Sequence, residues 1–504
     1  MASLEENGNF SRFFLFNSAV APTCVFLICI IIMIVFSTTK PIAKPRPVVW
    51  GTEAIMTLLS MIVTFVIWYL VRRNTRKFLI EKKRRDVTLN IKLVFFWAFG
   101  LANVFNSAFN MGSNFDCLLK DGQQPFLYAH YITIVTHLTE IFFCVGQLGF
   151  LSLYGKFSFK PSALMNYGIS LMIIAHLLRW FRLLFDSIMS NTSYSRSNWN
   201  ETYQNDCYYS SSVTVVLNHM SSYIIPMVTE YSLLSVVIVV RMVVGIFSNE
   251  SIQRNVGENI QDISDETATN DELVSSEMLT RRLSATASLT CGIIFSLPFC
   301  TAFTLTFLDT MNSVYAFRII STIYELEILA LLLFGKWKFK SQFTDIFIKD
   351  KTFSKYNMTL IFITSGAVAY ETFGAIAGLM KAENIFCFLL LFSKILQTSV
   401  IIIQTEFILH MKNISFRPKR VQSKYFRANR IFLCIFVINI IRWLMDSIVM
   451  GHETDASAIQ REFYGNVYWD TIEHTIFPVN VFYRFLTAME MYELYRNTNI
   501  KHSV

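Results

Sequence analysis

Charged residues and prolines are scarce in this sequence. Only 16% of the 504 residues are charged and only ten are proline, whereas 53% are hydrophobic and 47 are phenylalanine. The mean hydropathy of +0.43 lies outside the range of soluble proteins. Long lipid-facing helices accommodate such a composition better than a β-barrel, whose strands would alternate polar and apolar residues. The composition therefore predicts an all-α membrane protein embedded in a lipid bilayer.

Nine cysteines do not make a disulfide scaffold in a chain of this length. The net charge of +8 lies in short loops beside apolar stretches, so it reports topology rather than nucleic-acid binding. No nucleophile–base set, phosphate loop or metal cluster stands out, so we expect neither an enzyme nor a cofactor. The first apolar run follows Glu5 and Glu6, and we expect a retained span rather than a cleaved signal peptide.

Apolar stretches of about 20 residues, the length that crosses a bilayer, recur along the whole chain. We count twelve, divided six and six by an acidic, Ser/Thr-rich segment whose composition predicts disorder. We expect a six-helix half over 1–247, a cytoplasmic linker over 248–282 and a second six-helix half over 283–504. The predicted spans lie near 13–37, 48–71, 88–111, 126–152, 162–185, 219–246, 284–308, 313–335, 357–380, 384–410, 428–450 and 470–492.

Basic residues gather in three loops that would share one side of the membrane. Eight Lys and Arg lie between Arg72 and Arg85, and further groups lie over 336–355 and 412–427. Basic loops face the cytoplasm. We therefore expect a multi-pass cell-membrane protein with both termini in the cytoplasm; the basic residues between 40 and 46 are a mild exception.

The loop after the fifth span would then be extracellular. It holds N-glycosylation acceptor sequences at Asn191 and Asn200. Cys117 and Cys207 lie in the proposed outer loops, where the oxidising compartment allows a disulfide and where two free thiols are the alternative.

Three short matches in the same order relate spans four to six to spans ten to twelve. They are QLGFL at 147–151 with QTEFI at 404–408, HLLRW at 176–180 with NIIRW at 439–443, and IP at 225–226 with FP at 477–478. Because six spans separate the partners, the two halves would run parallel, as in transporter folds built from repeats. The fold class we predict is twelve transmembrane helices in two pseudo-repeated six-helix halves.

Glu230 lies in the apolar stretch from Tyr223 to Val240, one helical turn after Pro226. A carboxylate at membrane depth costs roughly 2.5–3.5 kcal/mol, so such a residue is a functional candidate by default. The structural alternative is an ion pair with a buried arginine or lysine.

Buried amides and an imidazole accompany this acid on neighbouring spans. Gln147 and His176 would converge with Glu230 in the first half, and Gln404 and Asn439 lie at the matching positions of the second. Together with water, an amide, an imidazole and a carboxylate can relay protons, whereas a bare cation would find too few oxygen ligands. Hydrogen bonding between helices is the alternative role for the two glutamines.

Other ionisable side chains also fall at membrane depth. We expect Arg179 with Asp186, and Arg442 with Asp446, to be interfacial ion pairs that set helix depth. Lys394 would neutralise one of the acids of spans eight and nine, but the sequence does not indicate which one. These acids are Glu325, Glu327 and Glu371.

The histidines indicate a functional site less clearly than Glu230 does. His137 and Glu140 share a helix face, but two ligands make a weak metal site. Three histidines near the predicted outer ends could sense acid or bind Zn²⁺, although each alone is more often an ordinary surface residue. They are His219, His452 and His474.

Four segments resemble the transmembrane helices of the otopetrin proton channels. PMVTEYSL at 226–233 is similar to their sixth helix, and the run from Tyr464 to Phe485 to their last. QTEFI at 404–408 and the stretch from Asn439 to Trp443 resemble their tenth and eleventh helices. With twelve spans in two halves, the resemblance covers nearly the whole chain.

The resemblance implies a homodimer that conducts protons, opens on extracellular acid and is blocked by Zn²⁺, with sterol or lipid as a further bound molecule. It implies constrictions at Gln147, His176 and Glu230, and at Gln404 and Asn439. The sequence departs from the family where His176 replaces the usual Asn, and where Leu and Thr at 486–487 replace His and Ser. A proton-coupled solute transporter and a non-conducting chemosensory protein are the alternatives.

Overall fold

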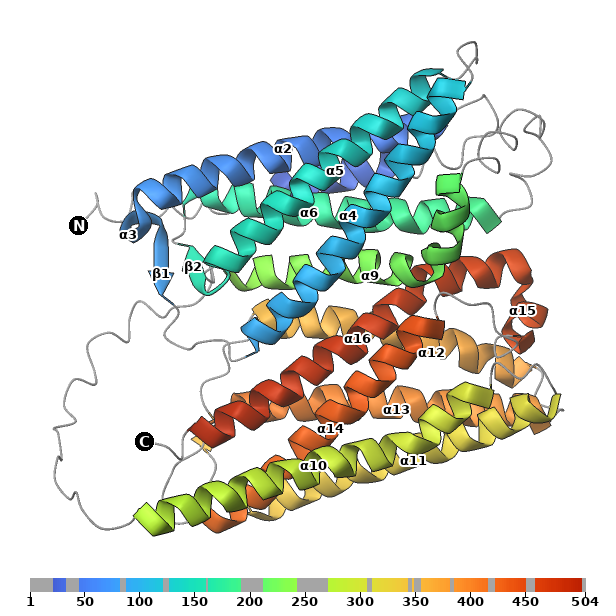
Figure 1. Ribbon diagram of the computed structural model, residues 1–504. Coiled ribbons are helices and arrows are strands. Elements are labelled where there is room, and N and C mark those ends of the chain that lie inside the picture. The colour runs from blue at the N-terminus through green and yellow to red at the C-terminus, as the bar shows by residue number, and fades with distance from the viewer. Residues whose placement is uncertain are drawn as a thin grey trace, which may run out of the picture.

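Two bundles of long helices form the protein, one from each half of the chain (Figure 1). The computed structural model describes residues 21–32, 45–81, 88–120, 127–159, 162–191, 212–242, 271–305, 311–342, 347–348, 355–380, 385–415, 422–449 and 458–500.

The first half contains α2 (Pro45–Arg73), α3 (Thr75–Phe78), α4 (Leu89–Lys120), α5 (Leu127–Tyr154), α6 (Ala163–Asn191) and α9 (Ser212–Met242). The second contains α10 (Asp271–Leu305), α11 (Met311–Gln342), α12 (Lys355–Met380), α13 (Ile385–Asn413), α14 (Gln422–Val449), α15 (Ala458–Tyr464) and α16 (Asn466–Ile500).

The helical membrane fold is confirmed. Within the described residues, nine helices are long and apolar enough to cross a bilayer: α2, α4, α5, α6, α9, α10, α12, α13 and α14. Helices α11 and α16 are as long but carry more charged residues, and the described part of the first predicted span is the short apolar helix Ala21–Ile32. The count of twelve spans therefore stays a prediction.

The helices of each half close into a ring with the same order of neighbours. In the second half the order is α10, α11, α13, α12, α16, α14 and back to α10. In the first half it is α2, α5, α4, α9, α6 and back to α2. The helix Ala21–Ile32 packs against α2 and α6 through Cys29, which is the place that α10 holds in the other ring. The internal repeat predicted from three short matches is therefore present in the packing.

Two short strand pairs repeat this relation outside the helices. β1 (Leu79–Glu81) pairs with β2 (Phe157–Phe159), and β3 (Phe347–Ile348) pairs with β4 (Ile414–Ser415), both antiparallel. In each half the first strand follows the second predicted span and the second strand follows the fourth. These pairs lie at the end of the bundle that carries Arg72, Arg73 and Lys412, which we call the basic end.

The side chains are distributed as a lipid environment requires, with apolar groups outward and polar groups inward. Large hydrophobic side chains are exposed on the outer helix faces; Phe362 is 74% exposed and Val94 is 69% exposed. Polar side chains such as Asn103, Gln147 and Glu325 are fully buried. Burying polar groups inside the bundle keeps them out of hydrocarbon, where they would lack partners.

Helix α10 begins at Asp271, so the prediction of a disordered linker over 248–282 is wrong for residues 271–282. Residues 243–270 lie outside the described part of the chain.

The two rings meet along a seam where α6 and α9 of the first half contact α16, and α9 also contacts α12 and α14. Aromatic side chains fill part of it. Phe95 of α4 packs edge-on against Trp443 of α14 and Phe485 of α16, with ring centroids 5.4 and 5.1 Å away. Phe99 lies against the same two rings.

Candidate functional site

The carboxylate of Glu230 lies at the seam, where it accepts hydrogen bonds from the other half of the molecule. The indole Nε1 of Trp443 donates to its Oε1 over 2.5 Å, and the Oγ of Ser447 donates to the same oxygen over 3.4 Å. Both donors belong to α14. Glu230 is only 3% exposed, so this contact joins the two halves inside the protein.

Neutral partners distinguish Glu230 from the other buried acids of the described helices. Glu53, Glu140, Glu325 and Glu371 each form an ion pair with an arginine or a lysine. Within the described residues no basic side chain pairs with Glu230. Its carboxyl group can therefore gain or lose a proton without breaking an ion pair.

The next residue along α9 points in a different direction. The ring of Tyr231 stacks on Phe96 and meets the imidazole of His176 edge-on, with centroids 5.3 and 5.6 Å apart. Successive helix positions are about 100° apart, since 3.6 residues make one turn. Tyr231 therefore faces the first ring while Glu230 faces the seam.

Gln147, His176 and Glu230, which the sequence predicts to converge, have different direct partners. Gln147 of α5 donates from Nε2 to the hydroxyl of Thr64 on α2 over 2.8 Å. His176 of α6 is fully buried, and neither ring nitrogen has a hydrogen-bond partner among the described residues. Glu230 is directed at α14, so the three side chains make no direct hydrogen bond to one another, and a relay between them through water stays a prediction.

The matching polar residues of the second ring are also buried. Gln404 of α13 is 1% exposed and Asn439 of α14 is 3% exposed. The amide of Asn439 donates to the carbonyl of Ile435 in its own helix over 2.9 Å. Next to Gln404, the hydroxyl of Thr405 lies 3.1 Å from that of Tyr483 on α16. Phe482 stands where the first half has Glu230, and it is fully buried.

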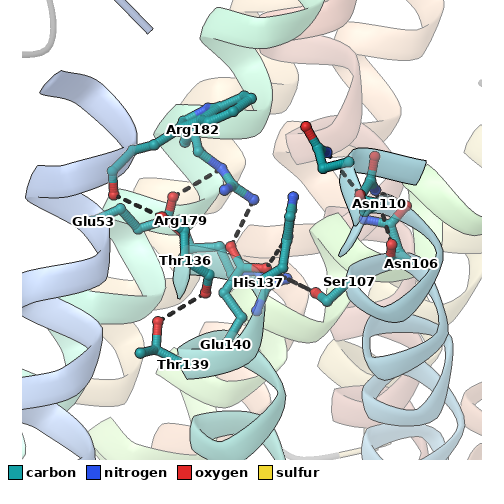
Figure 2. Close-up of polar contacts among 12 residues, drawn as sticks. Glu53, Asn106, Ser107, Asn110, Thr136, His137, Thr139, Glu140, Arg179 and Arg182 are labelled. Carbon is teal, nitrogen blue, oxygen red and sulfur yellow. Dashed lines mark hydrogen bonds and ion pairs between the residues drawn. The ribbon is translucent and has the colours of Figure 1, made fainter. Parts of the chain in front are cut away.

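A network of charged side chains crosses the interior of the first ring around Glu140 (Figure 2). Arg179 and Arg182 of α6 contact the two carboxylate oxygens of Glu140 at 3.2 and 2.7 Å. His137 lies 3.0 Å from the same carboxylate, and Ser107 of α4 donates to it over 2.8 Å. The carboxylate of Glu140, which with His137 was considered as a weak metal site, is therefore bound by protein side chains.

Glu53 completes this network from α2. Its carboxylate lies 2.8 Å from Nε of Arg182 and is fully buried. Sequence reasoning missed both residues. A sequence pattern could have revealed Glu53, because it begins a series of polar residues at helical spacing along one face of α2, all of which are buried. This polar stripe continues with Thr57, Ser60 and Thr64.

The second ring is crossed by ion pairs of its own. Arg442 of α14 pairs with Glu325 of α11 and lies 3.7 Å from Asp446. Lys394 of α13 pairs with Glu371 of α12 at 2.7 Å, which identifies the acid that the sequence left open. Seven residues separate Glu140 from Gln147, and the same interval separates Gln397 from Gln404. Lys394 contacts Gln397 at 3.1 Å, so the two networks are related by the repeat.

The prediction of an interfacial Arg179–Asp186 pair is wrong for Arg179. This arginine is 2% exposed and binds Glu140 on the facing helix instead of reaching toward the membrane surface. The side chain of Asp186 lies outside the described residues. The Arg442–Asp446 pair is present, but Arg442 is buried and its closer partner is Glu325.

An ionic contact also joins the halves, at the basic end of the seam. Glu490 of α16 pairs with Arg241 of α9 at 3.0 Å and with Lys412 of α13. Glu493, one turn later, lies 3.6 Å from Arg241 and 3.7 Å from Lys412. An acid from the second half is thus shared by one basic residue from each half.

Several predicted site residues have side chains outside the described part of the chain. They are His219, His452 and His474, the glycosylation acceptors Asn191 and Asn200, and the cysteines Cys117 and Cys207. Within the residues that are described, no three His, Cys, Asp or Glu side chains are grouped so that they could hold a metal ion.

Comparison with known proteins identifies the family of this chain. The sequence model of the otopetrin family matches residues 185–485, which is more than half of the 504 residues. The chain belongs to the otopetrin family. The matched region begins in α6 and ends in α16, so it contains Glu230, Trp443 and Ser447. This otopetrin is also similar to "Proton channel OtopLc" of Drosophila melanogaster, with 25% identity over 149 residues. That match covers 29% of this otopetrin and 9% of the length of the Drosophila protein.

Proposed function

We propose that this otopetrin is a proton-selective channel and that protons cross the membrane by way of Glu230. The observation that carries the proposal is the neutral environment of this acid: a buried carboxyl group at membrane depth, bonded to an indole N–H and a hydroxyl. An acid held in an ion pair would serve as a structural element. Glu230 has no such partner among the described residues and is free to titrate.

Proton selectivity follows from the same surroundings. The indole N–H of Trp443 stabilises a carboxylate but cannot ligate a metal cation, and Ser447 adds only one hydroxyl oxygen. A sodium or potassium ion would have to exchange its hydration shell for several oxygen ligands, as it does in a selectivity filter. A single carboxylate among aromatic rings cannot provide that shell. A proton needs only one carboxyl oxygen at a time and a neighbouring water.

The name of the Drosophila relative supports proton conduction, and the basic loops support a cell-membrane orientation with both termini in the cytoplasm. In this proposal extracellular acid opens the channel and protons enter the cell. Block by Zn²⁺ through His219, His452 or His474, glycosylation at Asn191 and Asn200, assembly as a homodimer and binding of sterol or lipid belong to the same proposal.

Two routes through the molecule can be distinguished. Protons could follow the seam through Glu230, or they could pass through the rings at Gln147 and His176 and at Gln404 and Asn439. In both rings, buried arginines or lysines hold the acids in ion pairs, which would have to break before these acids could take up a proton. Glu230 at the seam is in no such pair among the described residues, so we favour the seam.

Whole-cell patch clamp across steps of external pH, with sodium replaced by a large organic cation, tests the function. We expect an acid-evoked inward current whose reversal potential shifts by about 59 mV per pH unit, the value for a single charge. Glu230→Ala should abolish this current while surface expression stays normal. Glu406→Ala is the matched control, because Glu406 is an exposed acid paired with Lys336.

The same recording separates the alternatives. A proton-coupled transporter would give an acid-evoked current only when its solute is present, and a non-conducting protein would give none. Normal current in Glu230→Ala would refute the role assigned to this acid.

A further inference from the structure

A pocket of about 370 Å³ lies between α10 and α11, on the outer side of the second ring. Its walls are Ile294, Phe295, Leu297, Pro298 and Thr301 of α10 and Glu327 of α11. The volume lies within the range of small-molecule sites, about 300–1,000 Å³. Ile294 is 63% exposed and Leu297 is 52% exposed, so the pocket opens on the face that we assign to lipid.

Glu327 is the charged group of this pocket. It lies near the middle of α11, and Ile323 and Leu326 beside it are exposed apolar residues. Among the described residues it has neither an ion-pair nor a hydrogen-bond partner. Every other membrane-depth acid described above has partners in the protein. A carboxylate left without one in hydrocarbon is costly, and a bound cation would remove that cost.

The remaining polar atoms of the pocket are also hydrogen-bond acceptors. Pro298 has no N–H to donate to the carbonyl of Ile294, four residues earlier in the helix. The hydroxyl of Thr301 already donates to the carbonyl of Pro298 over 2.8 Å. The pocket therefore presents acceptors beside apolar walls, and it is complementary to a donor head group on an apolar tail.

We propose that this pocket binds a membrane-soluble amphiphile with a protonated amine. The ammonium group contacts the carboxylate of Glu327, and the hydrocarbon part lies along Ile294, Phe295 and Leu297. A sterol hydroxyl could satisfy one acceptor but would leave the carboxylate charge uncompensated. The site lies on the outer side of the second ring, away from Glu230, so it does not depend on the proposed proton conduction.

Photolabelling of the purified full-length chain in phosphatidylcholine nanodiscs tests this site. The probe is alkyne-tagged sphingosine with a diazirine in its chain, and the comparison probe is the corresponding ceramide, in which the amine is an uncharged amide. We expect the amine probe to label residues 294–301 and the ceramide to label them much less. Glu327→Gln should lower labelling about ten-fold, because a charge-assisted contact is lost. Glu406→Gln, which changes an exposed acid on another face, should leave labelling unchanged.

Ile294→Trp gives a second variant that fills the pocket and keeps the acid. It should also lower labelling, and fluorescence size-exclusion profiles should show that both variants remain folded. Equal labelling by the amine and ceramide probes, or by a diazirine cholesterol, would overturn the assignment. So would unchanged labelling in Glu327→Gln, or a cross-link between two copies of the chain through residue 294 or 297, which would show that a second copy covers the pocket.

Discussion

At the scale of single residues, the structure explains how an acid can stay buried without an opposite charge. The N–H of Trp443 and the hydroxyl of Ser447 both donate to Oε1 of Glu230, and the N–H contact is the shorter one. Hydrogen bonds to charged groups contribute about 1.5–3 kcal/mol. Trp443→Phe keeps an aromatic ring at the seam and removes this donor. We expect the acid-evoked current at a given pH to fall about ten-fold, measured by patch clamp with surface expression quantified in parallel.

The internal repeat supplies the control for this prediction. Trp180 holds the position in HLLRW that Trp443 holds in NIIRW, but its indole N–H has no hydrogen-bond partner among the described residues. Trp180→Phe removes the same atoms from the equivalent place, so its current should match the wild type. Equal losses in the two variants would mean that the aromatic packing, rather than the donor to Glu230, supports conduction.

At the scale of elements, the sequence predicted the helices well but not the partners of their polar side chains. Hydropathy located the spans because each is about as long as the bilayer is thick. The pairing of Arg179 with Glu140 depends on which helices are neighbours in the ring, and sequence spacing along one helix favoured Asp186 instead. The acid that pairs with Lys394 was left open for the same reason. Glu53 was missed, although its polar stripe on α2 could have revealed it.

The charged network of the first ring should be important for stability. Arg182→Gln would leave Glu53 and Glu140 buried with one cation fewer, and removing one partner of a buried pair costs about 3–5 kcal/mol. We expect a clear drop in the thermal unfolding temperature of the detergent-purified chain, partly restored by adding Glu53→Gln. Arg461→Gln breaks a more exposed pair with Asp470 and should cost less than about 1 kcal/mol. Similar losses in both variants would argue against a special role for the buried network.

Close helix packing makes a second prediction at this scale. A Cβ added to Gly378 of α12 would lie 2.8 Å from the backbone nitrogen of Leu391 and 2.9 Å from the carbonyl oxygen of Cys387, both in α13. Backbone atoms cannot rotate away, so Gly378→Ala should cost about 1–3 kcal/mol of unfolding free energy. Gly51→Ala meets nothing within 4 Å and should be neutral or slightly stabilising. Thermal unfolding of the two variants side by side checks the difference.

At the scale of the whole molecule, the sequence indicated two related halves. It did not indicate that the buried acids inside the rings form ion pairs while the acid at the seam, Glu230, has neutral partners. The repeat placed Gln147 and Gln404 at equivalent positions, and both are buried in their rings. It could not show that Glu230 turns toward α14, because that direction is set by the docking of one half on the other. The missing acid of the second half is part of this asymmetry: Phe482 is fully buried at the position that corresponds to Glu230.

The asymmetry leads to a prediction about the route. If protons follow the seam, Gln147→Leu and Gln404→Leu should each keep acid-evoked currents within about two-fold of the wild type, because these swaps conserve volume and leave Glu230 with its partners. If protons pass through the rings, each substitution removes one polar constriction, and the double variant should lose the current altogether. Recording the two single variants, the double variant and Glu230→Ala under one pH protocol separates the routes. A silent double variant with normal surface expression would contradict conduction along the seam.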